Sequence, residues 1–223
     1  MTNGWPPNRA PAPAQVAVTN KGIQAIVWGM LAAIVAAIAL AFFLTRSKSA
    51  PLPVLGQMAD FTLQDQDNHA VSLSDLHGKV WVADVIFTRC AGQCPLMSSH
   101  LKAIAGRISA SAPIRFITFT TDPAFDTPPV MKKYAQRYEA DTSRWIFLTG
   151  GKPALRAVIV DGLKLTSMDK AAVEQENPAD LFVHSAKFVL IDGAGQIRGY
   201  YDGETEASIA QVSDVAEQLA RNP

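Results

Sequence analysis

Residues 79–95 have the sequence KVWVADVIFTRCAGQCP, which joins a nearly continuous apolar run to a loop with two cysteines. Residues 79–87 predict a central strand, because a strand that is buried on both faces carries few polar side chains. Pro95 suits the first position of a helix, where its missing backbone N–H costs nothing. Cys90 and Cys94 thus lie between a buried strand and a helix. Open α/β sheets form their sites at that end of the strands, so we expect the chemistry of this protein there.

Strand and helix patterns alternate on both sides of this stretch and predict one α/β domain over residues 59–223. The helix predicted over 95–109 places Met97, Leu101, Ile104 and Ile108 on one stripe. The other expected elements are a hairpin over 61–64 and 70–73, a strand over 114–120, a helix from Pro128 capped by Asp126 or Thr127, a strand over 145–148, a hairpin over 186–191 and 196–201, and a helix over 205–221.

An uncharged apolar run over residues 23–44 precedes this domain, with Lys21 before it and Arg46 after it. Its length suits a transmembrane helix and exceeds the apolar core of a signal peptide, so we expect a single uncleaved anchor rather than a cleaved signal. Residues 1–20, rich in proline and alanine, predict a disordered cytoplasmic stub. Residues 45–58 predict a linker between the anchor and the domain.

The charges argue against a nucleic-acid partner. The chain has 20 basic and 20 acidic residues, and its net charge is zero. All 20 acids but only 16 basic residues follow residue 50, which leaves the part after the anchor near −4. A domain of this charge has no electrostatic attraction for phosphate backbones.

The two cysteines of the chain, Cys90 and Cys94, are separated by three residues in the loop where a site is expected. Each alone would suit a buried core position. Together they can form a disulfide, or they can hold one soft metal ion as thiolates. We expect the start of the following helix and Arg89 to lower the pKa values of both thiols.

A third metal ligand would come from the four histidines. His184 follows an irregular acidic segment and directly precedes a predicted strand, so it can reach the cysteines from the same edge of the sheet. From spacing alone, this role for His184 stays open. We expect His69, His77 and His100 to be solvated or capping residues in turns and on the first helix.

The chain resembles the Sco/SenC family in three motifs, which follow the predicted N-terminal anchor in this order: FTRCAGQCP, TTDPAFDTP and VHSAKFVLID. The resemblance implies a thioredoxin-like fold, with a central mixed sheet flanked by helices. It also implies one copper ion bound by Cys90, Cys94 and His184. The family often has Pro-Asp and a further Asp where this chain has Ala91-Gly92 and Val183. Fewer carboxylates favour Cu(I), with Cu(II) as the other possible state.

The donor set suits the implied metal. Two thiolates and an imidazole are soft to borderline ligands that favour Cu(I), whereas Ca²⁺ and Mg²⁺ prefer oxygen. Zinc competes for such ligands, but a structural zinc site usually has four of them and only three are nominated here. Three ligands suit a carrier, because the ion can then leave by stepwise ligand exchange.

The resemblance implies a function in assembling cytochrome c oxidase, with the copper-receiving subunit of the oxidase as partner. It points to no particular copper donor or thiol reductant. A site with two cysteines needs a compartment where disulfide exchange is normal. We therefore expect a single-pass protein of the inner (cytoplasmic) membrane, with its domain on the periplasmic or equivalent side.

A thiol-disulfide oxidoreductase that uses Cys90 and Cys94 is the alternative. Asp84 supports it, because this acid lies in the buried strand six residues before Cys90, the spacing of a buried acid implicated in proton transfer in thioredoxins. A structural role for Asp84, satisfied by a neighbouring strand or hydroxyl, is equally open. A peroxidase is the weaker possibility, since peroxiredoxins do not place their catalytic cysteine in such a pair.

Two further groups of residues are expected to be structural. Asp122 and Asp126 precede prolines or Thr-Pro and suit turns and helix caps, beside the site. The methionines that could suggest a copper site are not clustered and are expected to pack in the core: Met58, Met97, Met131 and Met168.

Overall fold

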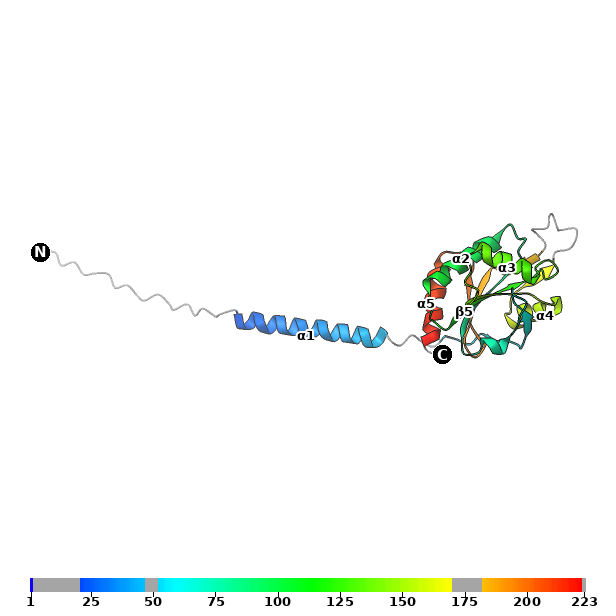
Figure 1. Cartoon of the computed structure of the whole chain (residues 1–223). Coiled ribbons are helices and arrows are strands. Elements are labelled where there is room, and N and C mark those ends of the chain that lie inside the picture. Colours follow the sequence, from blue (N-terminus) through cyan, green and yellow to red (C-terminus); the bar gives the residue numbers. More distant parts are fainter. Residues whose placement is uncertain (2–20, 47–51, 170–181, 222–223) are drawn as a thin grey trace. The chain divides into compact units, whose positions relative to one another are not determined.

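The computed structural model describes Met1 and residues 21–46, 52–169 and 182–221. It divides into two compact units, Met1–Pro51 and Leu52–Pro223 (Figure 1). The described part of the first unit is essentially one helix, α1, Lys21–Arg46. Within it, Lys21–Phe42 is long and apolar enough to cross a membrane, since 22 residues at about 1.5 Å each span roughly 33 Å. Length and composition fit an anchor, and a signal sequence meets the same criteria.

The second unit is built on a six-stranded mixed sheet with the strand order β1-β10-β9-β4-β5-β6. β4, β5 and β6 are parallel, whereas β9, β10 and β1 join antiparallel. All seven residues of β4 are buried, as the apolar run of the sequence predicts. The strands are β1 (Gly56–Gln57), β4 (Val80–Ile86), β5 (Ile114–Thr120), β6 (Trp145–Leu148), β9 (Lys187–Ile191) and β10 (Gln196–Asp202).

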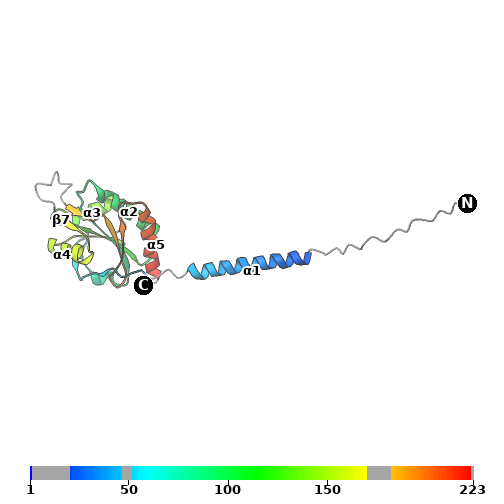
Figure 2. The same ribbon diagram turned by 180° about the vertical axis from the view of Figure 1, so that it is seen from behind.

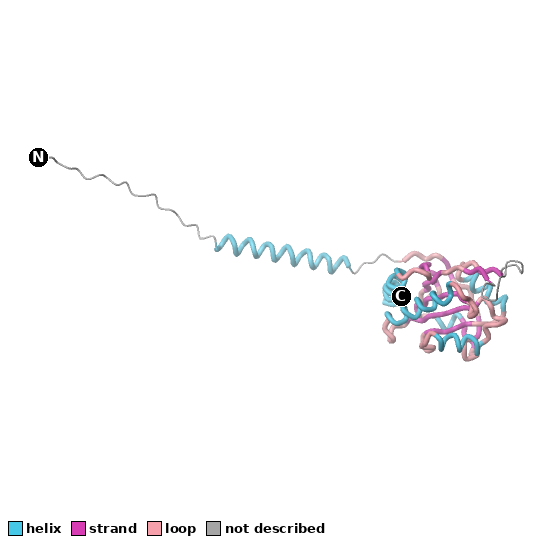
Figure 3. The backbone as a smooth tube through the Cα atoms, turned by 90° about the horizontal axis from the view of Figure 1, so that it is seen from above, coloured by secondary structure: helices cyan, strands magenta, loops and turns pink. Residues whose placement is uncertain are grey.

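Helices cover both faces of this sheet (Figures 2 and 3). One face packs against α2 (Gln93–Arg107), α3 (Pro128–Arg137) and α5 (Ala207–Arg221). The other face packs against a hairpin, a 3₁₀-helix and two short helical segments: β2 (Thr62–Gln64), β3 (Ala70–Ser72), η1 (Leu73–Leu76), α4 (Lys152–Arg156) and η2 (Ala157–Gly162). The predicted α/β domain with a mixed sheet flanked by helices is confirmed.

Successive residues of β4 point to opposite faces, which divides the core in two. Val80, Val82 and Ile86 pack with the three longer helices. Trp81, Ala83 and Val85 pack with the hairpin and the short helices. By the same alternation Asp84 lies on the face covered by α2, as the sequence predicts.

Several elements differ from the expectation. α2 begins at Gln93, so Pro95 is its third residue and not its first. β1 pairs with β10 and lies inside the range 45–58 that the sequence predicts as a linker. α4 and η2 were not expected, because they are shorter than a pattern of hydrophobic periodicity can reveal.

A separate two-stranded sheet is formed by β7 (Ser167–Asp169) and β8 (Phe182–His184), which pair antiparallel. It contains His184, the histidine of the third sequence motif. β8 leads through two residues into β9. The acidic segment predicted as irregular, residues 174–180, lies outside the described residues, as do residues 2–20 of the stub and residues 47–51 of the linker.

Candidate metal centre

Cys90 and Cys94 lie where β4 leads into α2, at the end of the parallel strands where the sequence places the site. Cys90 follows a tight turn in which its backbone N–H donates to the Phe87 carbonyl over 3.1 Å. Cys94 is the second residue of α2 and is fully buried, whereas Cys90 is partly exposed. No disulfide joins them. One thiol is therefore within reach of a partner, while the other lies beneath it against the core.

The two thiols interact directly, and this changes the proton affinity of Cys94. A hydrogen bond with the Cys90 side chain and burial of the group raise the pKa of the Cys94 thiol above its usual range. The charge of Asp84 acts in the same direction. The expected lowering of this pKa is therefore wrong for the metal-free protein. A soft metal ion must displace the proton of Cys94 when it binds.

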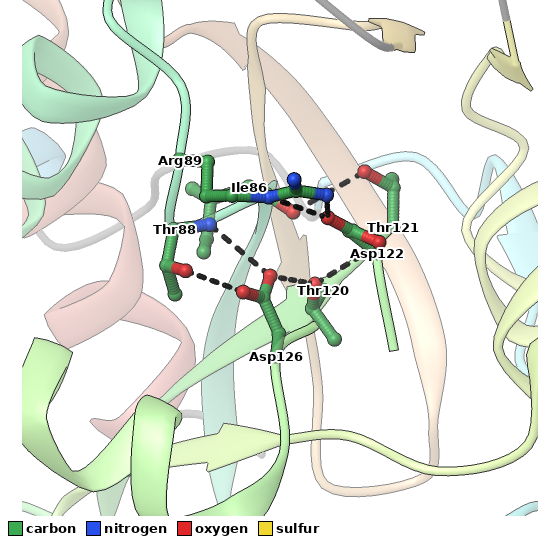
Figure 4. Close-up of polar contacts among 7 residues, drawn as sticks. All are labelled: Ile86, Thr88, Arg89, Thr120, Thr121, Asp122 and Asp126. Atoms are coloured by element: carbon green, nitrogen blue, oxygen red, sulfur yellow. Dashed lines mark hydrogen bonds and ion pairs between the residues drawn. The ribbon is translucent and has the colours of Figure 1, made fainter. Parts of the chain in front are cut away.

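The loop before Cys90 is tied to the loop after β5 by the Asp126 carboxylate (Figure 4). This carboxylate accepts hydrogen bonds from the Thr88 backbone N–H, over 3.1 Å, and from the Thr88 hydroxyl. The Thr120 hydroxyl donates to it as well. Asp126 is fully buried, and burial raises its pKa above the usual value of 3.8. Its neighbour Thr127, not Asp126, stands at the N-terminal cap of α3.

A second contact between the same loops involves Arg89 and Asp122 (Figure 4). The Arg89 guanidinium donates to one Asp122 carboxylate oxygen through Nε, over 3.2 Å, and through a terminal nitrogen. The same guanidinium stacks on the Phe125 ring, 4.3 Å from its centroid. Asp122 also holds the predicted turn, because its carbonyl accepts the backbone N–H groups of Phe125 and Asp126. Arg89 thus pairs with a carboxylate.

The expectation for Asp122 and Asp126 was therefore incomplete. A turn and a cap are local, whereas both carboxylates bind residues more than thirty positions earlier in the chain. The roles of Thr88 and Thr120 were missed altogether. The only signal for them was the placement of a threonine at the ends of two neighbouring parallel strands, where loops meet.

Asp84 is fully buried in β4 and takes part in a hydrogen-bonded chain that crosses three strands. The Thr118 hydroxyl of β5 donates to Asp84 Oδ1 over 2.6 Å. The indole N–H of Trp145 in β6 donates to the Thr118 oxygen over 2.8 Å. This contact agrees with the expected hydroxyl partner on a neighbouring strand. Asp84 also lies close enough to Cys94 for its charge to affect that thiol.

The backbone of His184 lies at the same edge of the sheet as the cysteine loop. β9 runs antiparallel to β4, with Ala83 opposite Val189. The start of β9 therefore lies at the end of β4 that leads to Cys90. His184 ends β8, three residues before β9 begins. Its side chain lies outside the described part of the structure, so its role as a ligand stays a prediction.

The other three histidines occupy two environments. His69 and His77 are exposed, as expected. His100 is 8% exposed, and its Nδ1 lies 2.8 Å from the Gly203 carbonyl oxygen. The expectation that His100 is solvated is therefore wrong: the stripe of α2 that faces the core includes it.

The structure describes two of the three predicted metal donors, and both suit a soft ion. Among the residues with described side chains, no group of three His, Cys, Asp or Glu could hold a metal. Two thiols in contact supply two of the three donors that the sequence predicts, and both are soft. The core methionines confirm their expected role where they are described: Met58, Met97 and Met131 are buried.

Comparisons with known proteins agree on one family. A family model described as SCO1/SenC matches residues 54–220. The SCO1 protein homolog of Bacillus subtilis is 34% identical over 152 residues, which are 68% of this chain and 76% of that protein.

Solved structures share the fold. BsSco, described as a member of the Sco family of cytochrome c oxidase assembly proteins, has a TM-score of 0.67 and 28% identity, and the match covers 79% of this chain and 100% of BsSco. ScoI of Arabidopsis thaliana, solved with copper bound, has a TM-score of 0.62 and 20% identity, and the match covers 74% and 99% of the two chains. The thioredoxin-like fold implied by the three motifs is confirmed.

Proposed function

This chain belongs to the SCO1/SenC family, and from that membership we propose that it is a membrane-anchored copper chaperone for cytochrome c oxidase. It binds one copper ion through Cys90, Cys94 and His184 and delivers the ion to the copper-receiving subunit of the oxidase. Two relatives support the proposal. BsSco is described as a member of a family of cytochrome c oxidase assembly proteins, and Arabidopsis ScoI was solved with copper bound.

The observation that carries the proposal is the contact between the two thiols at the end of β4. Cys90 is partly exposed, and its side chain forms a hydrogen bond with the buried Cys94. Two sulfur atoms this close can bind one soft ion with little rearrangement of the loop. The Asp126 and Arg89 contacts hold the residues before Cys90, which reduces the ordering that metal binding would otherwise require.

Copper is the cargo of this site, not a resident cofactor. Cu(I) is the favoured form, because two thiolates and one imidazole are soft to borderline donors and the loop has no carboxylate beside the cysteines. Cu(II) is the second form to test. An ion with three ligands at a partly exposed position leaves a coordination position open for a donor of the partner, and stepwise ligand exchange can follow.

The anchor is the second part of the proposal. α1 carries the apolar stretch Lys21–Phe42, and the folded unit begins at Leu52. We assign the anchor to the inner membrane and the folded unit to the periplasmic or equivalent side. There it would meet an oxidase subunit that receives copper outside the cytoplasm.

Metal competition on the purified full chain in detergent micelles tests the metal and its ligands. With both thiols reduced, the protein should take one Cu(I) from a chromophoric chelator and should release Zn²⁺ when Cu(I) is added. Cys90→Ser and Cys94→Ser should each abolish this competition. A double Cys→Ser variant that still binds one Cu(I) with parental affinity would contradict the proposal.

A thiol-disulfide oxidoreductase is the second candidate, and Asp84 favours it. This carboxylate is buried beneath the cysteine loop, and its charge acts on Cys94. A buried acid near a buried thiol can accept the proton that the thiol must lose before it attacks a disulfide. In the chaperone the same group would have only an indirect effect on copper.

A further inference from the structure

Gly203 joins two parts of the candidate metal site that are far apart in the sequence. It follows β10, and its backbone N–H donates to the Ala186 carbonyl over 2.9 Å. Its own carbonyl oxygen lies 2.8 Å from Nδ1 of His100 in α2. A carbonyl only accepts, so Nδ1 of His100 carries the proton and donates. Gly203 is thus bonded to α2 on one side and to the residue that precedes β9 on the other.

Besides forming these hydrogen bonds, Gly203 is closely packed. A Cβ atom at this position would lie 3.0 Å from Met97 Cε, 3.1 Å from Met97 Cγ and 3.3 Å from the Ala186 carbonyl oxygen. Met97 is fully buried and His100 is 8% exposed, so α2 has little room to move away. A side chain at position 203 would therefore push α2 and the Ala186 backbone apart by a few tenths of an ångström.

The residues that contact Gly203 lie close in the chain to two predicted copper ligands, Cys94 and His184. Met97 and His100 are in the same helix as Cys94, one and two turns further on. Ala186 is two residues after His184. We propose that the Gly203 junction, formed by Met97, His100, Gly203 and Ala186, is a positioning device that fixes the separation between Cys94 and the backbone of His184.

This inference rests on the proposed function, because it concerns the third ligand of the same site. Cys90 and Cys94 belong to one loop and one helix, so their separation does not depend on the junction. The separation of Cys94 from His184 does depend on it, since the two residues are 90 positions apart in the sequence. A disturbed junction should therefore weaken copper binding while it leaves the chemistry of the dithiol intact.

Gly203→Ala tests the junction, and the chain offers a matched control. At Gly162 a Cβ atom would also lie 3.0 Å from a methionine methyl group, that of Met58, on the other face of the sheet. Gly203→Ala should weaken Cu(I) binding by roughly ten- to a hundredfold, the usual effect of outer residues that orient metal ligands. Gly162→Ala should bind Cu(I) as the parent does. The rate at which Cys90 and Cys94 form a disulfide should be parental in both variants.

His100 supplies a second, independent pair of variants. Asparagine can place an N–H near the position of Nδ1, whereas leucine cannot donate a hydrogen bond. His100→Leu should weaken Cu(I) binding, and His100→Asn should recover part of the loss. X-ray absorption of the Cu(I)-loaded chain in detergent micelles should show two sulfur donors and one nitrogen in the parent, and a reduced nitrogen contribution in Gly203→Ala and His100→Leu.

His184→Ala, measured beside these variants, separates the two claims. If His184→Ala binds Cu(I) with parental affinity, the proposed ligand set fails. If His184→Ala binds weakly but Gly203→Ala and His100→Leu retain parental affinity and the parental nitrogen signal, the ligand set stands and the junction has no positioning role. Equal losses in Gly203→Ala and Gly162→Ala would also overturn the inference, because they would indicate general destabilisation.

Discussion

The Asp126 carboxylate accepts hydrogen bonds from the backbone N–H and the hydroxyl of Thr88, 38 positions earlier in the chain. Thr88 is two residues before Cys90, so a buried carboxylate in one loop determines the path of the loop that carries the first thiol. This contact relates the Thr-Asp-Pro motif to the cysteine motif.

Asp126→Asn should destabilise the domain. The amide keeps one acceptor oxygen, and its NH₂ group can donate to the Thr88 hydroxyl, but it carries no charge, so the charge-assisted hydrogen bonds of the carboxylate are lost at a cost of about 1 kcal/mol. Urea unfolding of the full chain in detergent measures the change. Asp214→Asn, on the exposed face of α5, is the control and should leave stability unchanged. Equal stabilities of Asp126→Asn and Asp214→Asn would show that the contact adds nothing.

The pH dependence of the same variant has a definite sign. Burial raises the pKa of Asp126, so the folded state binds its proton more tightly than the unfolded state. Stability from this group is therefore full below its unfolded pKa, near 3.8, and is lost as the pH rises through its higher folded pKa. The unfolding free energy of the parent relative to Asp126→Asn should fall as the pH rises through that window, and then level off. A difference that rises with pH would contradict the assignment.

Arg89→Ala should leave the Asp122 carboxylate, whose side chain is 7% exposed, without its cation. A loss of about 1–3 kcal/mol is expected, less than for a fully buried pair because the Arg89 side chain is 29% exposed. The double variant Arg89→Ala/Asp122→Asn should recover part of it, since the isolated charge is gone. If the double variant is no more stable than Arg89→Ala in urea unfolding, the ion pair is not the cause.

Asp84→Asn distinguishes the two candidate functions. The chaperone account predicts near-parental Cu(I) affinity, because Asp84 is not a ligand and acts on copper only through the proton of Cys94. If thiol exchange is the main task, the variant should exchange disulfides more slowly with a small dithiol while copper binding is unchanged. Equal exchange rates in variant and parent would leave Asp84 a structural partner of Thr118.

A topology reporter fused after Pro223 tests the side of the membrane. The account predicts activity of a reporter that works only outside the cytoplasm, such as alkaline phosphatase. A fusion that is active only with a cytoplasmic reporter would place the folded unit on the wrong side for the proposed partner.

The sequence could predict the elements whose pattern is local. The apolar run of residues 79–87 predicts β4. The loop from Cys90 to Cys94 could be predicted because the apolar pattern ends after Phe87. The start of α2 was placed two residues late, because Pro95 is tolerated within the first turn and not only at its first position. The contacts of Asp126 and His100 could not be predicted, because their partners lie 38 and 103 positions away and no local pattern encodes such pairings.

His184 is the residue on which the chaperone account depends most. If copper is held by two thiolates and one imidazole, His184→Ala removes one of three ligands and leaves the dithiol untouched. The variant should still form the Cys90 to Cys94 disulfide at a near-normal rate and should fail to support oxidase assembly. His77→Ala, at an exposed position, is the control and should behave as the parent does.

The most direct measurement is the Cu(I) affinity of the full-length His184→Ala protein, determined by competition with a chromophoric Cu(I) chelator beside the parent and His77→Ala. The account predicts a much lower affinity for His184→Ala alone. Parental affinity in His184→Ala would remove this histidine from the site and contradict the three-ligand carrier.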